Sequence, residues 1–214
     1  MRATESIVHV WRADLTKVEG GFEQLLHEDE LVRAARIVPA RKRVLWARSR
    51  GVLRALLGRY LERDPRELRF AFGPHGKPAL LPDGQTPTAG LRFNLSHSGG
   101  LALVAVTAGR EVGIDLEVAD RRVDELAIAA RVLGRAQAAR LAELDPRTRE
   151  REFMRAWVAH EAAIKCHGLG LATQPGDSRR TGLWTAELDV GPASYAAVAV
   201  EDGPCELHSW DWRA

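Results

Sequence analysis

The apolar run Val112–Val118 constrains the fold of this chain most, because two carboxylates, Asp115 and Glu117, stand among its aliphatic residues. Successive side chains of a strand point to opposite faces, so both carboxylates would share one face and Ile114 would lie on the other. Acidic side chains are depleted in strands and are costly to bury without a compensating cation. The run therefore predicts a strand with one apolar face and one face that holds a hard cation such as Mg2+.

Length and composition predict a folded protein with a substantial core. The chain has 214 residues, 45% of them hydrophobic, which is enough for one large domain or two small ones. Its apolar stretches are short, so we expect a cytoplasmic protein without a signal peptide or membrane anchor. The two cysteines, Cys166 and Cys205, are far apart and form no metal-binding motif, so neither a disulfide framework nor a zinc site is expected.

Charge is distributed unevenly along the chain. Residues 1–107 contain 17 Lys and Arg against 11 Asp and Glu, whereas residues 108–214 contain 14 against 18. Between Leu31 and Leu61 there are nine basic residues and no acidic one. Such a segment suits a polyanionic ligand, but it is also typical of a solvated, Arg-rich helix, and the charge pattern alone leaves both interpretations open.

The order of the predicted elements favours an α+β fold with a largely antiparallel sheet. Periodicity and capping signals predict helices over residues 29–37, 41–61, 123–133, 137–144 and 149–167. Alternation and turn signals predict strands over residues 7–11, 68–72, 93–98, 101–107 and 112–118, followed by three antiparallel strands over 183–190, 194–200 and 206–212. The apolar stripe of the helix over 41–61 would face the core, and its arginine side chains would emerge on the other faces.

Trp157, Glu161 and Lys165 lie four residues apart in the last predicted helix and therefore share one face. Taken alone, this spacing indicates an ordinary ion pair beside an apolar anchor. Together with Asp115 and Glu117, however, Glu161 would complete a set of three carboxylates, and Mg2+ prefers such oxygen ligands together with substrate phosphates.

The chain offers further groups that could bind phosphate. They are Lys77 on a predicted loop, Ser96 and His97 at a predicted strand end, Lys165 on the last predicted helix, and the Arg-rich segment. Each has an ordinary structural alternative. His97 could be a hydrogen-bonded hairpin residue, and Lys77 could be a solvated turn residue. Whether these residues belong to a functional site is indicated by the order in which they and the acidic residues occur along the chain.

Four segments, taken in that order, resemble the successive motifs of the 4′-phosphopantetheinyl transferases. They are Gly76–Pro78, Phe93–Ser98, Val112–Glu117 and Trp157–Lys165. The resemblance extends from about Val8 to Trp210 and is to the monomeric, two-lobed type that serves secondary-metabolite synthases, such as those for polyketides and nonribosomal peptides. It implies two similar α+β lobes related by a pseudo-twofold axis, each a mostly antiparallel sheet with packed helices: a basic lobe of residues 1–108 and a carboxylate-bearing lobe of residues 109–214.

The resemblance also implies a reaction and a set of site residues. The 4′-phosphopantetheine arm would move from coenzyme A to a serine of an apo acyl or peptidyl carrier protein, and adenosine 3′,5′-bisphosphate would be released. Glu161 and Lys165 would be catalytic, and Asp115, Glu117 and Glu161 would bind Mg2+. The residues expected to hold coenzyme A are Arg33, Arg50, Lys77, Ser96, His97 and Lys165.

One position departs from the family pattern, because His160 stands where the family usually has Lys. We hypothesise that His160 partly replaces this cation, so that activity falls as the pH rises through its pKa. Two other classes of function remain as alternatives: a non-catalytic coenzyme A or nucleotide binder, and a nucleic-acid-binding protein that uses the basic segment. The second is disfavoured because three carboxylates would repel phosphates unless a metal intervened, so no nucleic-acid partner is expected. The short apolar stretches likewise predict no membrane partner.

Overall fold

A computed structural model describes residues 3–4, 6–18, 21–82, 90–118, 123–168 and 182–213. Its strands are β1 (Ile7–Asp14), β2 (Phe70–Phe72), β3 (Pro78–Leu80), β4 (Leu91–Ser98), β5 (Leu101–Ala108), β6 (Val112–Val118), β7 (Trp184–Glu187), β8 (Ser194–Val200) and β9 (Glu206–Asp211). Its α-helices are α1 (Glu28–Ala35), α2 (Ala40–Leu61), α3 (Glu125–Val132), α4 (Arg135–Ala142) and α5 (Pro146–His167). Short 3-10 helices cover Phe22–Leu25 and Pro65–Glu67.

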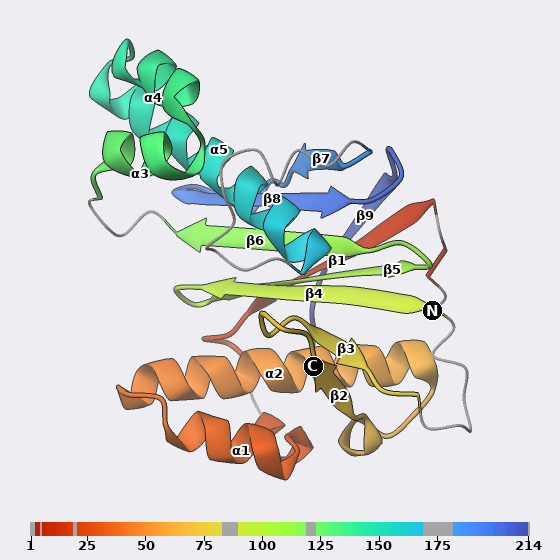
Figure 1. Ribbon diagram of the computed structural model, residues 1–214. Coiled ribbons are helices and arrows are strands. Elements are labelled where there is room, and N and C mark those ends of the chain that lie inside the picture. Colours follow the sequence, from red (N-terminus) through yellow and green to blue (C-terminus); the bar gives the residue numbers. More distant parts are fainter. Residues whose placement is uncertain are drawn as a thin grey trace.

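Helix α2, two sheets and helix α5 form successive layers (Figure 1). The first sheet has the strand order β4-β5-β1-β9, the second has the order β6-β8-β7, and β2 pairs with β3. Leu53 of α2 packs on Val104 of the first sheet, and Leu103 on the other face packs with Ile114 of the second. Ala162 of α5 covers the far side of the second sheet. The α+β class is confirmed, whereas the pseudo-twofold relation between two lobes stays a prediction.

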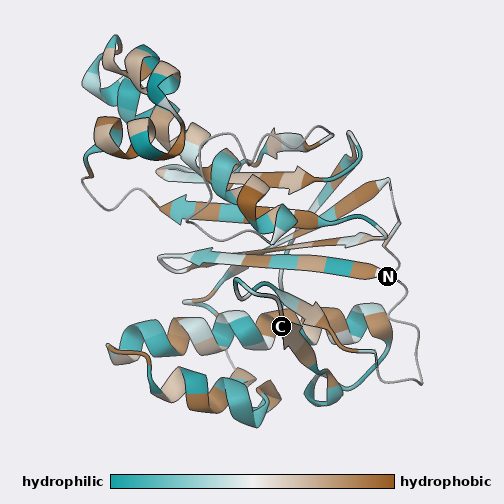
Figure 2. Ribbon diagram, viewed as in Figure 1, coloured by the Kyte–Doolittle hydropathy of each residue, from teal (hydrophilic) through white to brown (hydrophobic). Residues whose placement is uncertain are grey.

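The predicted strand Val112–Val118 is β6, and it has the two faces that its sequence requires. Ile114 and Leu116 are buried between the sheets, with 0% and 1% of their surface exposed. The intervening carboxylates of Asp115 and Glu117 lie on the opposite face, which α5 covers. Polar and apolar residues alternate along both β6 and β4 (Figure 2), as expected for strands whose two faces meet different surroundings.

Helix α5 ends at the predicted position but begins at Pro146, three residues before the predicted start. The Asp145 side chain accepts hydrogen bonds from the backbone N–H groups of Arg147 and Thr148, and Pro146 occupies the first turn. Gly168 ends the helix with a φ of 65°, a conformation in which glycine has no steric penalty. Among the described residues, no helix is both long and apolar enough to cross a membrane.

The prediction of three antiparallel strands at the end of the chain is wrong for the last of them. Strands β7 and β8 are antiparallel, but β9 pairs in parallel with β1 of the first sheet. This position stacks the ring of Trp210 on Trp11, with 5.0 Å between their centroids, and buries Trp212. The free energy gained by burying such large aromatic surfaces outweighs the advantage of the short connection that a hairpin with β8 would have had.

The prediction that all arginines of the helix over residues 41–61 emerge into solvent is also wrong. Arg50 and Arg54 are buried, with 7% and 1% of their surface exposed. Both donate to the carboxylate of Glu30, whose own exposure is 3%, at 2.9 Å from Arg50 Nε and 2.5 Å from Arg54 Nε. Both guanidinium groups also lie over the ring of Phe70. A buried acid thus compensates two buried cations and joins α1 to α2.

Candidate active site

Gly113 lets α5 lie directly on β6. A Cβ atom at this position would be 2.0 Å from the carbonyl oxygen of Ala162 and 2.3 Å from the backbone nitrogen of Cys166. Only a residue without a side chain therefore permits this approach of helix to strand. The close contact brings Lys165, on the same helix, to the carboxylate that lies two residues after the glycine.

The Asp115 carboxylate is the centre of a polar cluster beneath α5. Its Oδ1 accepts hydrogen bonds from Lys165 Nζ at 2.5 Å and from Ser96 Oγ at 3.0 Å. Glu117, further along β6, accepts a hydrogen bond from Ser98 Oγ at 2.9 Å. Two of the three predicted metal ligands, Asp115 and Glu117, are therefore tied to hydroxyl or ammonium groups of neighbouring elements.

Two buried carboxylate oxygens of this cluster, Asp115 Oδ2 and Glu161 Oε1, have no hydrogen-bond partner among the described residues. Buried polar atoms almost always have one, so these two oxygens call for an explanation. As the side chains stand, no three Asp, Glu, His or Cys residues of the described ranges form a group that could hold a metal ion. Since Lys165 bonds to Asp115 Oδ1, the ammonium itself compensates part of the negative charge.

Burial raises the pKa of Glu161 to about 7, and the neighbouring carboxylates of Asp115 and Glu117 act in the same direction. The Lys165 ammonium acts in the opposite direction. A carboxyl group with this pKa can accept or release a proton near neutrality, which suits a general base.

A second polar site lies on the other side of β4. A pocket of about 240 Å3 is bounded by α1, α2, the turn between β2 and β3, and β4. Arg33, Arg50 and His97, all predicted to bind the substrate, line it. Because successive residues of β4 point in opposite directions, Ser96 reaches the Asp115 cluster while His97 faces this pocket. One strand thus joins the acidic cluster to a pocket in which Arg33 and Arg50 lie beside the acids Asp29 and Glu30.

Lys77 lies apart from this pocket. Its ammonium donates to the Glu111 carboxylate at 2.6 Å, to the carbonyl oxygen of Cys166 at 2.6 Å and to that of Val112 at 3.1 Å. These three acceptors match the three N–H donors of a lysine. The structure therefore gives Lys77 a set of partners at the start of β6 and the end of α5, and the phosphate contact that the resemblance implied stays a prediction.

Burial lowers the pKa of His160, so its imidazole loses its proton at a lower pH than a solvated histidine does. The hypothesis that His160 partly replaces the usual lysine stays a prediction, and the lowered pKa moves the expected fall in activity to lower pH. Lys165 is the cation that the structure does bring to the acidic cluster.

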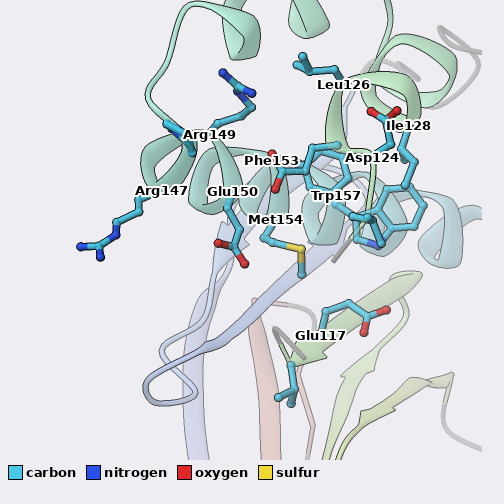
Figure 3. Close-up of a pocket in the computed structure, with 14 residues that line it drawn as sticks. Glu117, Asp124, Leu126, Ile128, Arg147, Arg149, Glu150, Phe153, Met154 and Trp157 are labelled. Atoms are coloured by element: carbon cyan, nitrogen blue, oxygen red, sulfur yellow. The ribbon is translucent and has the colours of Figure 1, made fainter. Parts of the chain in front are cut away.

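Sequence reasoning missed Ser98, Glu30 and an apolar pocket of about 660 Å3 beside Glu117. Figure 3 shows this pocket, with Met154 and Trp157 of α5 lining its wall. The spacing of Asn94, Ser96 and Ser98 could have pointed to Ser98, because their side chains fall on the same face of β4. Glu30 carried only the signal of a helix N-terminus, and the pocket depends on how α3 packs against α5.

The arrangement as a whole suits a phosphorylated substrate, since guanidinium and ammonium groups bind phosphates and acidic oxygens bind the accompanying cation.

Comparison with known proteins identifies the family of this chain. A sequence model of the 4′-phosphopantetheinyl transferase superfamily matches residues 111–212. The chain is 35% identical to the 4′-phosphopantetheinyl transferase HetI of Nostoc sp. over 202 residues, which cover 92% of this chain and 84% of that protein. It is 33% identical to the 4′-phosphopantetheinyl transferase AcpT of Escherichia coli over 115 residues, or 54% of this chain and 55% of that protein.

The chain therefore belongs to the 4′-phosphopantetheinyl transferase superfamily. The family predicted from the four motifs is confirmed, and with it the enzyme class, a transferase of the phosphopantetheinyl group. The roles of individual residues stay predictions and are taken up below.

Proposed function

We propose that this chain transfers the 4′-phosphopantetheine arm of coenzyme A to a serine hydroxyl of an apo acyl or peptidyl carrier protein in a Mg2+-dependent reaction. The observation that carries the proposal is the pair of buried oxygens, Asp115 Oδ2 and Glu161 Oε1, without a hydrogen-bond partner in the described chain. Their burial beside Lys165 and across β4 from the pocket of Arg33 fits a site for a cation and a pyrophosphate.

The two groups of site residues divide the substrate between them. Arg33, Arg50 and His97 would hold the 3′-phosphate in their pocket, while Lys165 would contact the pyrophosphate. Ser96, which bonds to both Lys165 and Asp115, would lie at the junction of the two groups. The first group belongs to the proposed basic lobe of residues 1–108 and the second mostly to the proposed lobe of residues 109–214.

The acidic cluster has the donor chemistry that Mg2+ requires, because its three acidic side chains offer carboxylate oxygens. Asp115, Glu117 and Glu161 would hold the ion. When bound, Mg2+ would neutralise negative charge on the pyrophosphate. Two of these side chains, Asp115 and Glu161, are already buried, so little of their solvation remains to be lost when the ion binds.

The chemical step takes place at the β-phosphorus of coenzyme A. The carrier serine oxygen would form a bond to this phosphorus, and the bond to the bridging oxygen would break, so that adenosine 3′,5′-bisphosphate leaves with the negative charge. Glu161 would take the proton of the serine hydroxyl, and Lys165 would stabilise the charge on the leaving phosphate. Most of the acceleration would come from positioning and electrostatics, as in other phosphoryl transfers.

The test is an intact-mass assay of an apo carrier protein incubated with the purified enzyme, coenzyme A and Mg2+. We expect a mass increase of one phosphopantetheine group on the carrier, and none on a carrier whose acceptor serine is replaced by alanine. A panel of fatty-acid, polyketide and peptide carriers identifies the preferred class, with secondary-metabolite carriers expected to react. Coenzyme A binding without any mass increase would instead indicate a non-catalytic binder.

Lys77→Met and Arg33→Gln are expected to have opposite effects. Loss of the Lys77 contacts should lower the free energy of unfolding by about 1–3 kcal/mol, since it removes three hydrogen bonds, one of them ionic. The KM of the Lys77→Met variant for coenzyme A should stay within about twofold of the wild-type value, because the ammonium lies outside the phosphate pocket. Arg33→Gln should lower the free energy of unfolding by no more than about 1 kcal/mol, the contribution of its contact with the Trp46 ring. It should raise the KM for coenzyme A by about tenfold, the effect of one lost ionic contact.

Thermal unfolding and steady-state kinetics on the two variants check this pair. The opposite pattern, with a raised KM for Lys77→Met at unchanged stability, would return Lys77 to the phosphate-binding role that the resemblance implied. We further propose that the enzyme is cytoplasmic and that it acts as a monomer. Light scattering at the concentration of the assay would test the monomeric state.

A further inference from the structure

Strands β4 and β6 belong to different sheets, yet side chains of one bind the backbone of the other. Asn94 Oδ1 accepts a hydrogen bond from the backbone N–H of Ile114 at 2.9 Å. Ser96 Oγ accepts from Leu116 N–H, and Ser98 Oγ accepts from Val118 N–H, both at 3.2 Å. Alternate residues of β4 therefore bind alternate backbone N–H groups of β6 across the boundary between the sheets.

The two serines differ from Asn94 in making a second contact. A hydroxyl group can accept and donate at once, so each serine also donates to the carboxylate that precedes its N–H partner. Ser96 Oγ lies 3.0 Å from Asp115 Oδ1, and Ser98 Oγ lies 2.9 Å from Glu117 Oε2. The residue that precedes the partner of Asn94 is a glycine, Gly113, so that link holds no carboxylate.

We propose that Ser98 is a positioning residue that fixes the Glu117 carboxylate for cation binding. Glu117 lies near the end of β6 and is only partly buried, so its side-chain torsions are less restricted by packing than those of Asp115. Ordering a long side chain of this kind when the cation binds costs conformational entropy. A hydroxyl held by the backbone of Val118 removes part of that cost before the cation arrives.

Ser98 acts on the cation through Glu117. It differs from Ser96 in the groups that it contacts. Ser96 Oγ also lies 3.1 Å from Lys165 Nζ, so a change there would disturb the lysine as well as the carboxylate. The inference rests on the proposed function, in which Glu117 is a Mg2+ ligand, and it assigns to that ligand a partner from the other sheet.

The test is a calorimetric titration of MgCl2 into the enzyme saturated with coenzyme A. Ser98→Ala should weaken Mg2+ affinity by about tenfold, the lower end of the effect of losing such a supporting hydrogen bond. Ser98→Thr should stay within about twofold of the wild type, because it keeps the hydroxyl and suits a strand. In the Glu117→Gln background, Ser98→Ala should have no further effect on Mg2+ affinity, since the two residues act as a unit.

Asn94→Ala is the matched control for a purely structural role. It removes the same kind of link between the sheets and should lower thermal stability without changing Mg2+ affinity in the folded protein. Equal losses of affinity in Asn94→Ala and Ser98→Ala, or no loss in Ser98→Ala, would overturn the inference; should Asn94→Ala not fold, the Ala and Thr variants of Ser98 still decide it. Unchanged affinity in Glu117→Gln would overturn the proposed set of metal ligands and the inference with it.

Discussion

Replacing Glu161 by glutamine is expected to reduce the rate of phosphopantetheinyl transfer by about 10²–10⁴-fold, the range for loss of a general base. The amide keeps the shape of the side chain but can neither accept the serine proton nor offer a charged oxygen to Mg2+. The same substitution should make the metal-free protein more stable at pH 8. A single substitution would therefore lower the transfer rate while it raises the stability of the folded protein.

The sign of the stability effect follows from the raised pKa of Glu161. Since the pKa is about 7 in the folded protein and 4.5 is the ordinary value, folding favours the protonated form. This contribution is fully present below pH 4.5 and is lost as the pH rises through 7. At pH 8 the ionised carboxylate therefore destabilises the folded state by up to about 3 kcal/mol, which the neutral amide avoids.

Denaturant unfolding of the metal-free protein at pH 5 and pH 8 measures this effect, with transfer rates measured at saturating Mg2+ and coenzyme A. Glu143→Gln, at an exposed position after α4, is the control and should change neither quantity. A wild-type transfer rate in Glu161→Gln would exclude the residue as the base. Equal stability of the variant and the wild type at pH 8 would show that burial beside Asp115 does not destabilise the ionised carboxylate.

Local patterns predicted the elements that carry the site. The alternation in Val112–Val118 and the glycine at position 168 are properties of neighbouring residues, so β6 and the end of α5 could be placed from the sequence. The cap at Asp145 was missed, and the start of α5 was predicted three residues late. The four-residue spacing likewise placed Glu161 and Lys165 on one helix face. These predictions needed no knowledge of the tertiary fold.

What the sequence did not reveal depends on contacts between distant segments. The parallel pairing of β9 with β1 joins residues about 200 positions apart, and strand periodicity carries no record of a partner. Arg54 is buried because Glu30 on another helix compensates it, and Lys77 finds its acceptors on β6 and α5. Polar residues gave the largest errors, since their burial is decided by a partner rather than by their own hydropathy.

Replacing Gly113 by alanine should impair both the fold and the activity. The added Cβ would lie 2.0 Å from the carbonyl oxygen of Ala162, which is backbone and cannot rotate away, so α5 must move off β6. Overpacking of this kind typically destabilises by about 1–3 kcal/mol, and a backbone clash this close belongs at or above the upper end. Because α5 carries Glu161 and Lys165, a displacement of about 1 Å should reduce transfer by about 100-fold.

Gly73→Ala provides the matched control, because a Cβ there would meet only Lys77 O at 3.7 Å, an ordinary contact. It should change the free energy of unfolding by less than about 0.5 kcal/mol and leave the transfer rate unaltered. The Gly113→Ala rate must be measured at a temperature at which circular dichroism shows the variant folded, so that a lower rate reports displaced side chains and not unfolded protein. Wild-type stability together with a wild-type rate in Gly113→Ala would mean that α5 and β6 do not need this approach, and that the position of Glu161 and Lys165 beside Asp115 is set by some other contact.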